Sequence, residues 1–172
     1  YGFRIRGVDK AGNTESYPPS AEITVSIPPA SELCKTPDAY ENDNSASKAK
    51  EFILNGAPQF HNFCNPEASN RLNDQDWLKF SVTNGRKYMI RSVPVNGSAP
   101  TILDLIASDG NTIIASSNAA AFAQETLIDW TADRTGTVYL RIRHLDSKAA
   151  GNTVSYWIQI EEPYLFVPIV NK

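Results

Sequence analysis

Two short strings rich in Asp, Asn and Glu are the residues of this chain best suited to chemistry. The first, D-A-Y-E-N-D-N-S, spans 38–45, and the second, N-D-Q-D-W, spans 73–77. Calcium takes about six to eight oxygen ligands from carboxylates, amides and backbone carbonyls, and two loops far apart in sequence can close on one ion. The same residue types also favour caps and turns, so spacing alone leaves both interpretations open. The fixed spacing of an EF-hand loop is absent.

Residue types for catalysis are sparse. The sequence holds two histidines, His61 and His144, and lacks the G-x-S-x-G, H-E-x-x-H and G-x-x-x-x-G-K patterns. Without a convergent nucleophile, base and orienting group, the sequence predicts a protein that is not an enzyme. His144 falls on the inward face of an expected strand, so we expect a core histidine there.

Cys34 and Cys64 are the two cysteines. In an exported protein an isolated pair most simply forms one disulfide. The alternative is a metal site that combines Cys64 with His61, although a second close pair of ligands is lacking.

Composition excludes several classes of partner. The chain has 172 residues and a formal net charge of −3. No cluster of Lys and Arg suggests a nucleic-acid binder, and no apolar run approaches the roughly 20 residues that span a bilayer. The chain opens without a start Met, which we interpret as a mature or truncated piece of a longer protein.

Strands must position these residues, because apolar and polar residues alternate with period 2 across 77–82, 138–144 and 154–160. Such strands bury one face, as antiparallel sheets do. Asn-Gly and Asp-Gly pairs at 84–85, 96–97 and 109–110 predict turns between them. The sequence therefore predicts an all-β sandwich or barrel, with one short helix over Ser45–Ile53.

Three segments follow from composition. Residues 1–30 contain two short strands, a turn at 9–13 and a Pro-Pro linker, residues 31–162 the main domain, and residues 163–172 an apolar tail. The string Y-G-F-R-I-R-G-V-D-K-A-G-N-T-E resembles the last hairpin of a fibronectin type III or related immunoglobulin-like domain. Because an isolated hairpin is marginal, we expect residues 1–27 to pack on the sandwich or a partner, or to self-associate. A private hairpin of the main domain is the alternative.

The main domain resembles the bacterial pre-peptidase C-terminal domain, whose relatives include the collagen-binding domains of collagenases. The matching strings, over roughly residues 32–161, are E-N-D-N-S at 41–45, D-Q-D-W-L-K-F at 74–80, P-T-I-L-D-L-I-A-S-D-G-N-T-I-I-A at 100–115, G-T-V-Y-L-R-I-R at 136–143 and S-Y-W-I-Q-I at 155–160. The resemblance implies a jelly-roll-like antiparallel β-sandwich, export, and a Cys34–Cys64 disulfide. It also implies calcium ligands at Glu41, Asp43, Asn44, Asp74 and Asp76. Ala39 stands where those relatives have a further acidic ligand, with Asp38 adjacent.

The resulting expectation is a non-catalytic, calcium-supported binding or adhesion module of a secreted multidomain bacterial protein, extracellular or at the cell surface. The alternatives are a removable or secretion-assisting C-terminal domain of an extracellular peptidase, and a structural subunit of an extracellular assembly. Upstream domains of the same polypeptide are expected partners. The candidate surface for a protein or polysaccharide ligand consists of Tyr139, Arg141, Arg143 and Trp157, because aromatic and Arg side chains dominate binding hot spots. The N-terminal hairpin or the apolar tail could instead cover these side chains.

Overall fold

The computed structural model describes residues 2–24, 34–68, 72–96, 99–119 and 124–163. The expected linker at 28–31, the second half of the Asn96-Gly97 turn, and the apolar tail from 164 onward lie outside the described residues. Nothing in the described structure bears on these predictions.

The described residues are almost entirely strands and turns. The elements are β1 (Gly2–Phe3), β2 (Ile23–Thr24), the 3₁₀ helix η1 (Ala46–Lys48), β3 (Lys50–Glu51), β4 (Gln59–Asn62), β5 (Gln75–Val82), β6 (Lys87–Pro94), β7 (Thr101–Ile106), β8 (Ile113–Asn118), β9 (Thr126–Thr131), β10 (Gly136–His144) and β11 (Ser155–Glu161). Among these residues no helix is long and apolar enough to cross a membrane.

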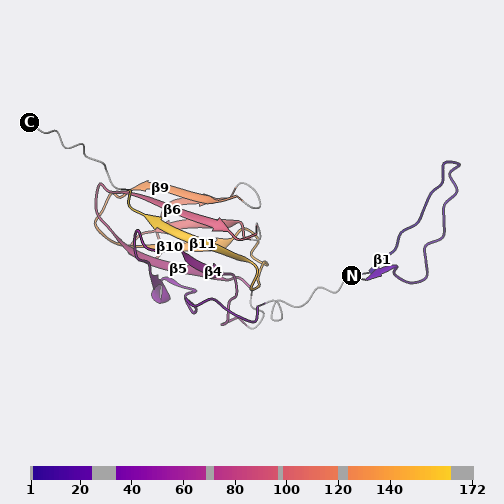
Figure 1. Cartoon of the computed structure of the whole chain (residues 1–172), viewed down its shortest axis with the longest axis horizontal. Coiled ribbons are helices and arrows are strands. Elements are labelled where there is room, and N and C mark those ends of the chain that lie inside the picture. Colours follow the sequence, from indigo (N-terminus) through magenta and orange to yellow (C-terminus); the bar gives the residue numbers. More distant parts are fainter. Residues whose placement is uncertain (1, 25–33, 69–71, 97–98, 120–123, 164–172) are drawn as a thin grey trace, which may run out of the picture.

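Two sheets form the main domain. One has the order β3-β5-β10-β7-β8 and the other the order β4-β11-β6-β9. All neighbouring strands are antiparallel except β3, which pairs with β5 in parallel. Figure 1 shows β9, β6 and β11 running side by side across the sandwich. The predicted all-β antiparallel sandwich is confirmed.

The core lies between the two sheets and follows the predicted alternation. Every second side chain of the long strands is buried in one cluster, including Leu78, Phe80, Val82, Val138, Leu140, Ile142, Tyr156, Ile158 and Ile160. In the central strand β10, Leu140 lies opposite Leu78 on β5 and Leu105 on β7. Alternation is a property of the pleated backbone, which is why the sequence alone identifies these positions.

Two local predictions need correction. The expected helix over Ser45–Ile53 is limited to η1, and β3 follows it directly because Lys50 and Glu51 pair with the edge of β5. Trp77, which alternation places on the outward face of its strand, is only 7% exposed. It packs with Ala49 and Ile106, so the segment around η1 and β3 covers the outside of β5.

The N-terminal segment forms a hairpin of its own. Gly2 and Phe3 pair with Thr24 and Ile23. The expected turn is closed by the Asp9 carboxylate, which accepts hydrogen bonds from the backbone N–H groups of Ala11 and Asn13. Every residue from 2 to 24 is exposed except the half-buried Pro18, so the apolar face of the hairpin is uncovered in the described chain.

Candidate metal centre

The first acidic string reaches the sandwich as a loop that is bonded to the start of β5. The backbone carbonyl of Asp43 accepts a hydrogen bond from the N–H of Trp77, with an N–O distance of 3.1 Å. The side-chain oxygen of Asn44 accepts one from the N–H of Gln75 at 3.3 Å. These bonds place the loop against the second acidic string, as the two-loop prediction requires.

Carboxylates from both strings converge there. Glu41, Asp74 and Asp76 each offer an oxygen, and these oxygens lie within 4.8 Å of one another. Asp43 is fully buried in the same region. Within the described chain, neither carboxylate oxygen of Glu41 or Asp43 has a hydrogen-bond partner, and the same holds for Asp74 Oδ2 and Asp76 Oδ1. Asn44, the fifth predicted ligand, also holds the loop to β5, because its amide oxygen accepts the hydrogen bond from Gln75.

Burial and mutual repulsion control the charge of this cluster. Desolvation, followed by the charges of Asp74 and Asp43, raises the pKa of Glu41 to about 9. Desolvation and Asp38 raise the pKa of Asp43 to about 8. Burial raises the pKa of Asp74 to about 6 and that of Asp76 well above its ordinary value. Carboxyl groups packed this closely cannot all ionise unless a cation neutralises them.

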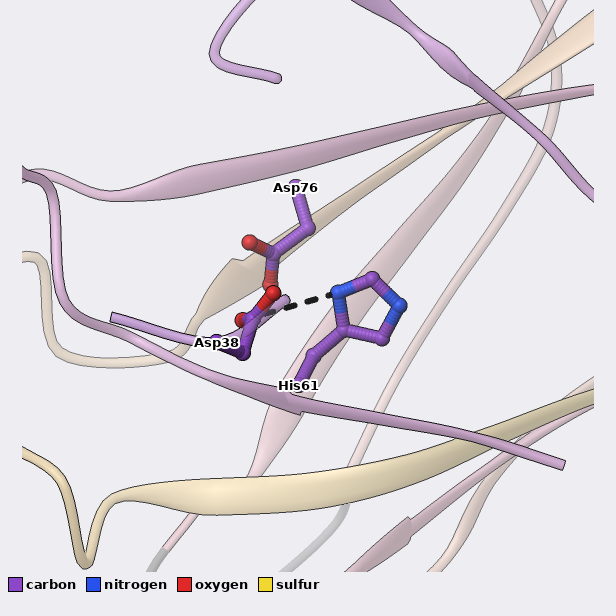
Figure 2. Close-up of side chains that lie close together, drawn as sticks. All are labelled: Asp38, His61 and Asp76. Carbon is purple, nitrogen blue, oxygen red and sulfur yellow. Dashed lines mark ion pairs between the residues drawn. The ribbon is translucent and has the colours of Figure 1, made fainter. Parts of the chain in front are cut away.

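Two further side chains join the cluster, Asp38, which the sequence suggested only as the acidic neighbour of Ala39, and His61, which it suggested only for a metal site with Cys64. His61, on β4, places its Nδ1 atom 3.7 Å from Asp38 Oδ2. Figure 2 shows this nitrogen pointing toward the carboxylates of Asp38 and Asp76. The side chains of Asp38 and His61 are both buried, and burial lowers the pKa of His61 to about 3 while it raises that of Asp38. Asp38 stood in the first acidic string, but only the position of β4 in the fold places His61 here.

Tyr156 connects the cluster to the second sheet. Its hydroxyl donates a hydrogen bond to Asp76 Oδ2. Tyr156 pairs with His61 in the ladder between β11 and β4, and the two rings stack with centroids 5.6 Å apart. The alternation predicted Tyr156 as a core residue, which is confirmed, but gave no sign of the bond to Asp76.

The cysteine pair lies next to this centre. Cys34 and Cys64 form a disulfide with their Cα atoms 5.3 Å apart, as the exported-protein interpretation predicts. Both cysteines are buried. The alternative metal site that used Cys64 is wrong, because the sulfur of Cys64 is engaged in the disulfide. His144 is buried against Phe63, which confirms its assignment to the core.

The predicted ligand-binding side chains lie on two different sheets. Tyr139, Arg141 and Arg143 belong to β10, whereas Trp157 belongs to β11 in the other sheet. Arg141 and Arg143 both form ion pairs with Asp104 Oδ2, at 2.9 and 2.8 Å. The fold therefore does not gather the four side chains on one face.

The chain is similar to solved structures, but not to family models or curated proteins. No protein-family model matches the chain, and no curated protein matches it. Among solved structures, the chain is similar to the pre-peptidase C-terminal domain of collagenase from Bacillus anthracis, at 17% sequence identity and a TM-score of 0.48. The match covers 65% of this chain and 93% of that domain. This is the family that the sequence motifs resemble.

Proposed function

We propose that this chain is a non-catalytic β-sandwich module of an exported multidomain protein, and that bound calcium supports its structure. One observation carries the proposal. Glu41, Asp43, Asp74 and Asp76 bring together six buried carboxylate oxygens that have no hydrogen-bond partner in the described part of the chain. Buried polar atoms are normally paired, and an uncompensated buried charge is costly, so a bound cation would satisfy these oxygens once the carboxyl groups are ionised.

The donor set fits calcium. All six atoms are oxygens, and calcium takes about six to eight oxygen ligands at flexible geometry, with carboxylates bound through one or both oxygens. The residues come from two loops that only the fold brings together. Asp43 and Asn44 already bond the first loop to β5 through the N–H groups of Trp77 and Gln75.

Calcium in this position would tie three parts of the domain together. The first loop precedes η1, Asp74 and Asp76 lie at the start of β5, and Asp76 bonds to Tyr156 on β11. A cation held by all four carboxylates would therefore link the N-terminal end of the domain to both sheets. The disulfide supports an oxidising location, since such bonds persist outside the cytosol.

An exposed aromatic pair supports the binding role of the module. Trp157 is 44% exposed and meets Phe60 edge to face, with ring centroids 5.2 Å apart. Both rings border a surface hollow that also includes Tyr40 and Asn152. Aromatic side chains are enriched in binding hot spots, where they bury a large apolar area inside a polar rim. We place the ligand-binding face of the module here.

The test is calcium-dependent stability. A ligand that binds only the native state raises the free energy of unfolding by about 2.7 kcal/mol at one hundred times its Kd. Melting of the metal-free chain should rise with added calcium, and Glu41→Gln should abolish the rise. Glu51→Gln is the matched control, because Glu51 is exposed and pairs only loosely with Lys79 at 3.9 Å. Identical melting curves with and without calcium would refute the proposal.

A further inference from the structure

His61 offers an imidazole nitrogen to the acidic cluster, and its tautomer can be assigned. Its Nε2 atom lies 3.3 Å from Gln59 Oε1. A carboxamide oxygen only accepts hydrogen bonds, so Nε2 of the neutral ring carries the proton. The lone pair is then on Nδ1. This atom is buried and has no hydrogen-bond partner within the described chain.

The lone pair of Nδ1 points at carboxylates. Asp38 Oδ2 is 3.7 Å away, which is too far for a hydrogen bond. Asp76 contributes an oxygen to the same group, whose ligand atoms all lie within 4.8 Å of one another. Figure 2 shows the three side chains converging from separate segments of the chain. Acceptor atoms that face one another repel, so a cation is the partner that satisfies all three.

The spacing suits a small divalent metal ion. Zn²⁺ binds imidazole nitrogen and carboxylate oxygen at about 2.0–2.2 Å, so two of its ligands lie about 3.4 Å apart at the tetrahedral angle and at most about 4.2 Å apart. The distance of 3.7 Å between His61 and Asp38 falls within this range. An imidazole in the ligand set favours zinc-type ions, whereas calcium prefers oxygen ligands alone.

The surrounding residues fix the three ligands in place. Gln59 orients the imidazole, and the backbone N–H groups of Tyr40 and Asn62 donate to Asp38 at 2.8 and 2.9 Å. The His61 ring also stacks on Tyr40, with centroids 4.6 Å apart. Such outer contacts orient the ligands of metal sites. Asp38 also borders the surface hollow beside Tyr40.

We propose that Asp38, His61 and Asp76 form a second cation position, next to the calcium ligands, that binds a transition-metal ion of the zinc class. Asp76 belongs to both groups of candidate ligands and would bridge the two positions. Charge favours a second ion, because five carboxylates meet here, whereas calcium supplies two positive charges and the nearby Lys50 ammonium one. This position stands on the His61 geometry and does not depend on calcium binding.

Zinc titration of the calcium-saturated chain by calorimetry tests this position. We expect one Zn²⁺ per chain, and His61→Gln should weaken its affinity by about a hundredfold or more, since even outer contacts cost about ten- to a hundredfold. The amide of the introduced Gln would occupy the position of Nε2, but the variant has no metal-ligating atom at the position of Nδ1. His144→Gln, at the other histidine, should keep the affinity of the original chain. Glu41→Gln should lose the calcium response and still bind zinc.

A second measurement avoids any folding defect of the variants. In the original chain labelled with ¹⁵N-histidine, only two imidazoles give signals. Zinc should shift the Nδ1 signal of His61 while its Nε2 keeps the proton. Unchanged zinc affinity in a folded His61→Gln variant would overturn the proposal. So would a His61 ring that carries protons on both nitrogens and does not respond to zinc.

Discussion

The free energy of unfolding of the metal-free chain should fall as pH rises through the neutral range. The pKa of Glu41 is raised to about 9 and that of Asp43 to about 8, whereas unfolded carboxyl groups titrate near 4. Between these values the folded chain binds more protons than the unfolded chain, so its stability is greatest at low pH and is lost as pH increases. His61 has the opposite effect below about pH 6.5, because its lowered pKa makes the unfolded chain the better proton acceptor there.

The window from pH 6.5 to 8 therefore isolates the carboxyl cluster. Each proton retained only by the folded chain lowers the free energy of unfolding by about 1.4 kcal/mol per pH unit, or about 2 kcal/mol across this window. Because Glu41 and Asp43 both retain protons over most of the window, the total decrease should exceed about 2 kcal/mol. Saturating calcium should abolish the decrease, because calcium binds the ionised carboxylates. Urea unfolding followed by Trp fluorescence, at constant ionic strength and after removal of divalent ions, measures both series.

Glu41→Gln sharpens this test. The amide carries no charge at any pH, so the metal-free variant should lose much of the pH dependence and be more stable than the original chain at pH 8. The same variant should gain little stability from calcium. A variant that is more stable without metal and no longer responds to calcium has lost carboxylate repulsion. A variant with a general folding defect would instead be less stable under both conditions. A metal-free chain whose stability is constant or rises from pH 6.5 to 8 would refute this account of the cluster.

Three further outcomes follow from the fold. Replacing Cys34 and Cys64 together by Ser should cost ~3.5 kcal/mol, because their disulfide closes a loop with a sequence separation of 30; a loss below about 1 kcal/mol in urea unfolding would contradict this. Leu140→Ala, at the fully buried centre of β10, should cost about 3 kcal/mol by the same assay, and a cost near that of an exposed substitution would show that the core is misassigned. Deleting residues 1–27 should leave the melting temperature of the sandwich unchanged, since residues 2–24 are almost wholly exposed. Light scattering should show self-association only in the chain that retains these residues. A monomer in both forms would exclude association through this segment.

Local pattern accounts for much of the fold. Leu78, Leu140 and Ile158 could be placed in the core from alternation alone, because successive side chains of a strand point to opposite faces whatever the strand pairs with. The turn at Gly85 was likewise predictable, since its φ of 79° is a conformation that glycine adopts readily. The departure at η1 and β3 has a tertiary cause: pairing with the edge of β5 overrides a modest helical preference.

The candidate site was likewise only partly predictable from the sequence. Residue chemistry singled out the two acidic strings, and the family resemblance implied Glu41, Asp43, Asp74 and Asp76 within them. Carboxylates that cluster in sequence stay close in any fold. Whether the two strings meet depends on the bonds from Trp77 and Gln75 to the first loop.

The contribution of His61 and Tyr156 could come only from the tertiary structure. These two residues are 95 positions apart in sequence (156 − 61) and become neighbours because β4 pairs with β11. Their approach to Asp76 then requires the two sheets to pack face to face. Alternation assigns each side chain to a buried face, but the distance between two buried side chains depends on strand order, register and sheet packing. Those are set by contacts between distant segments, which no local pattern contains.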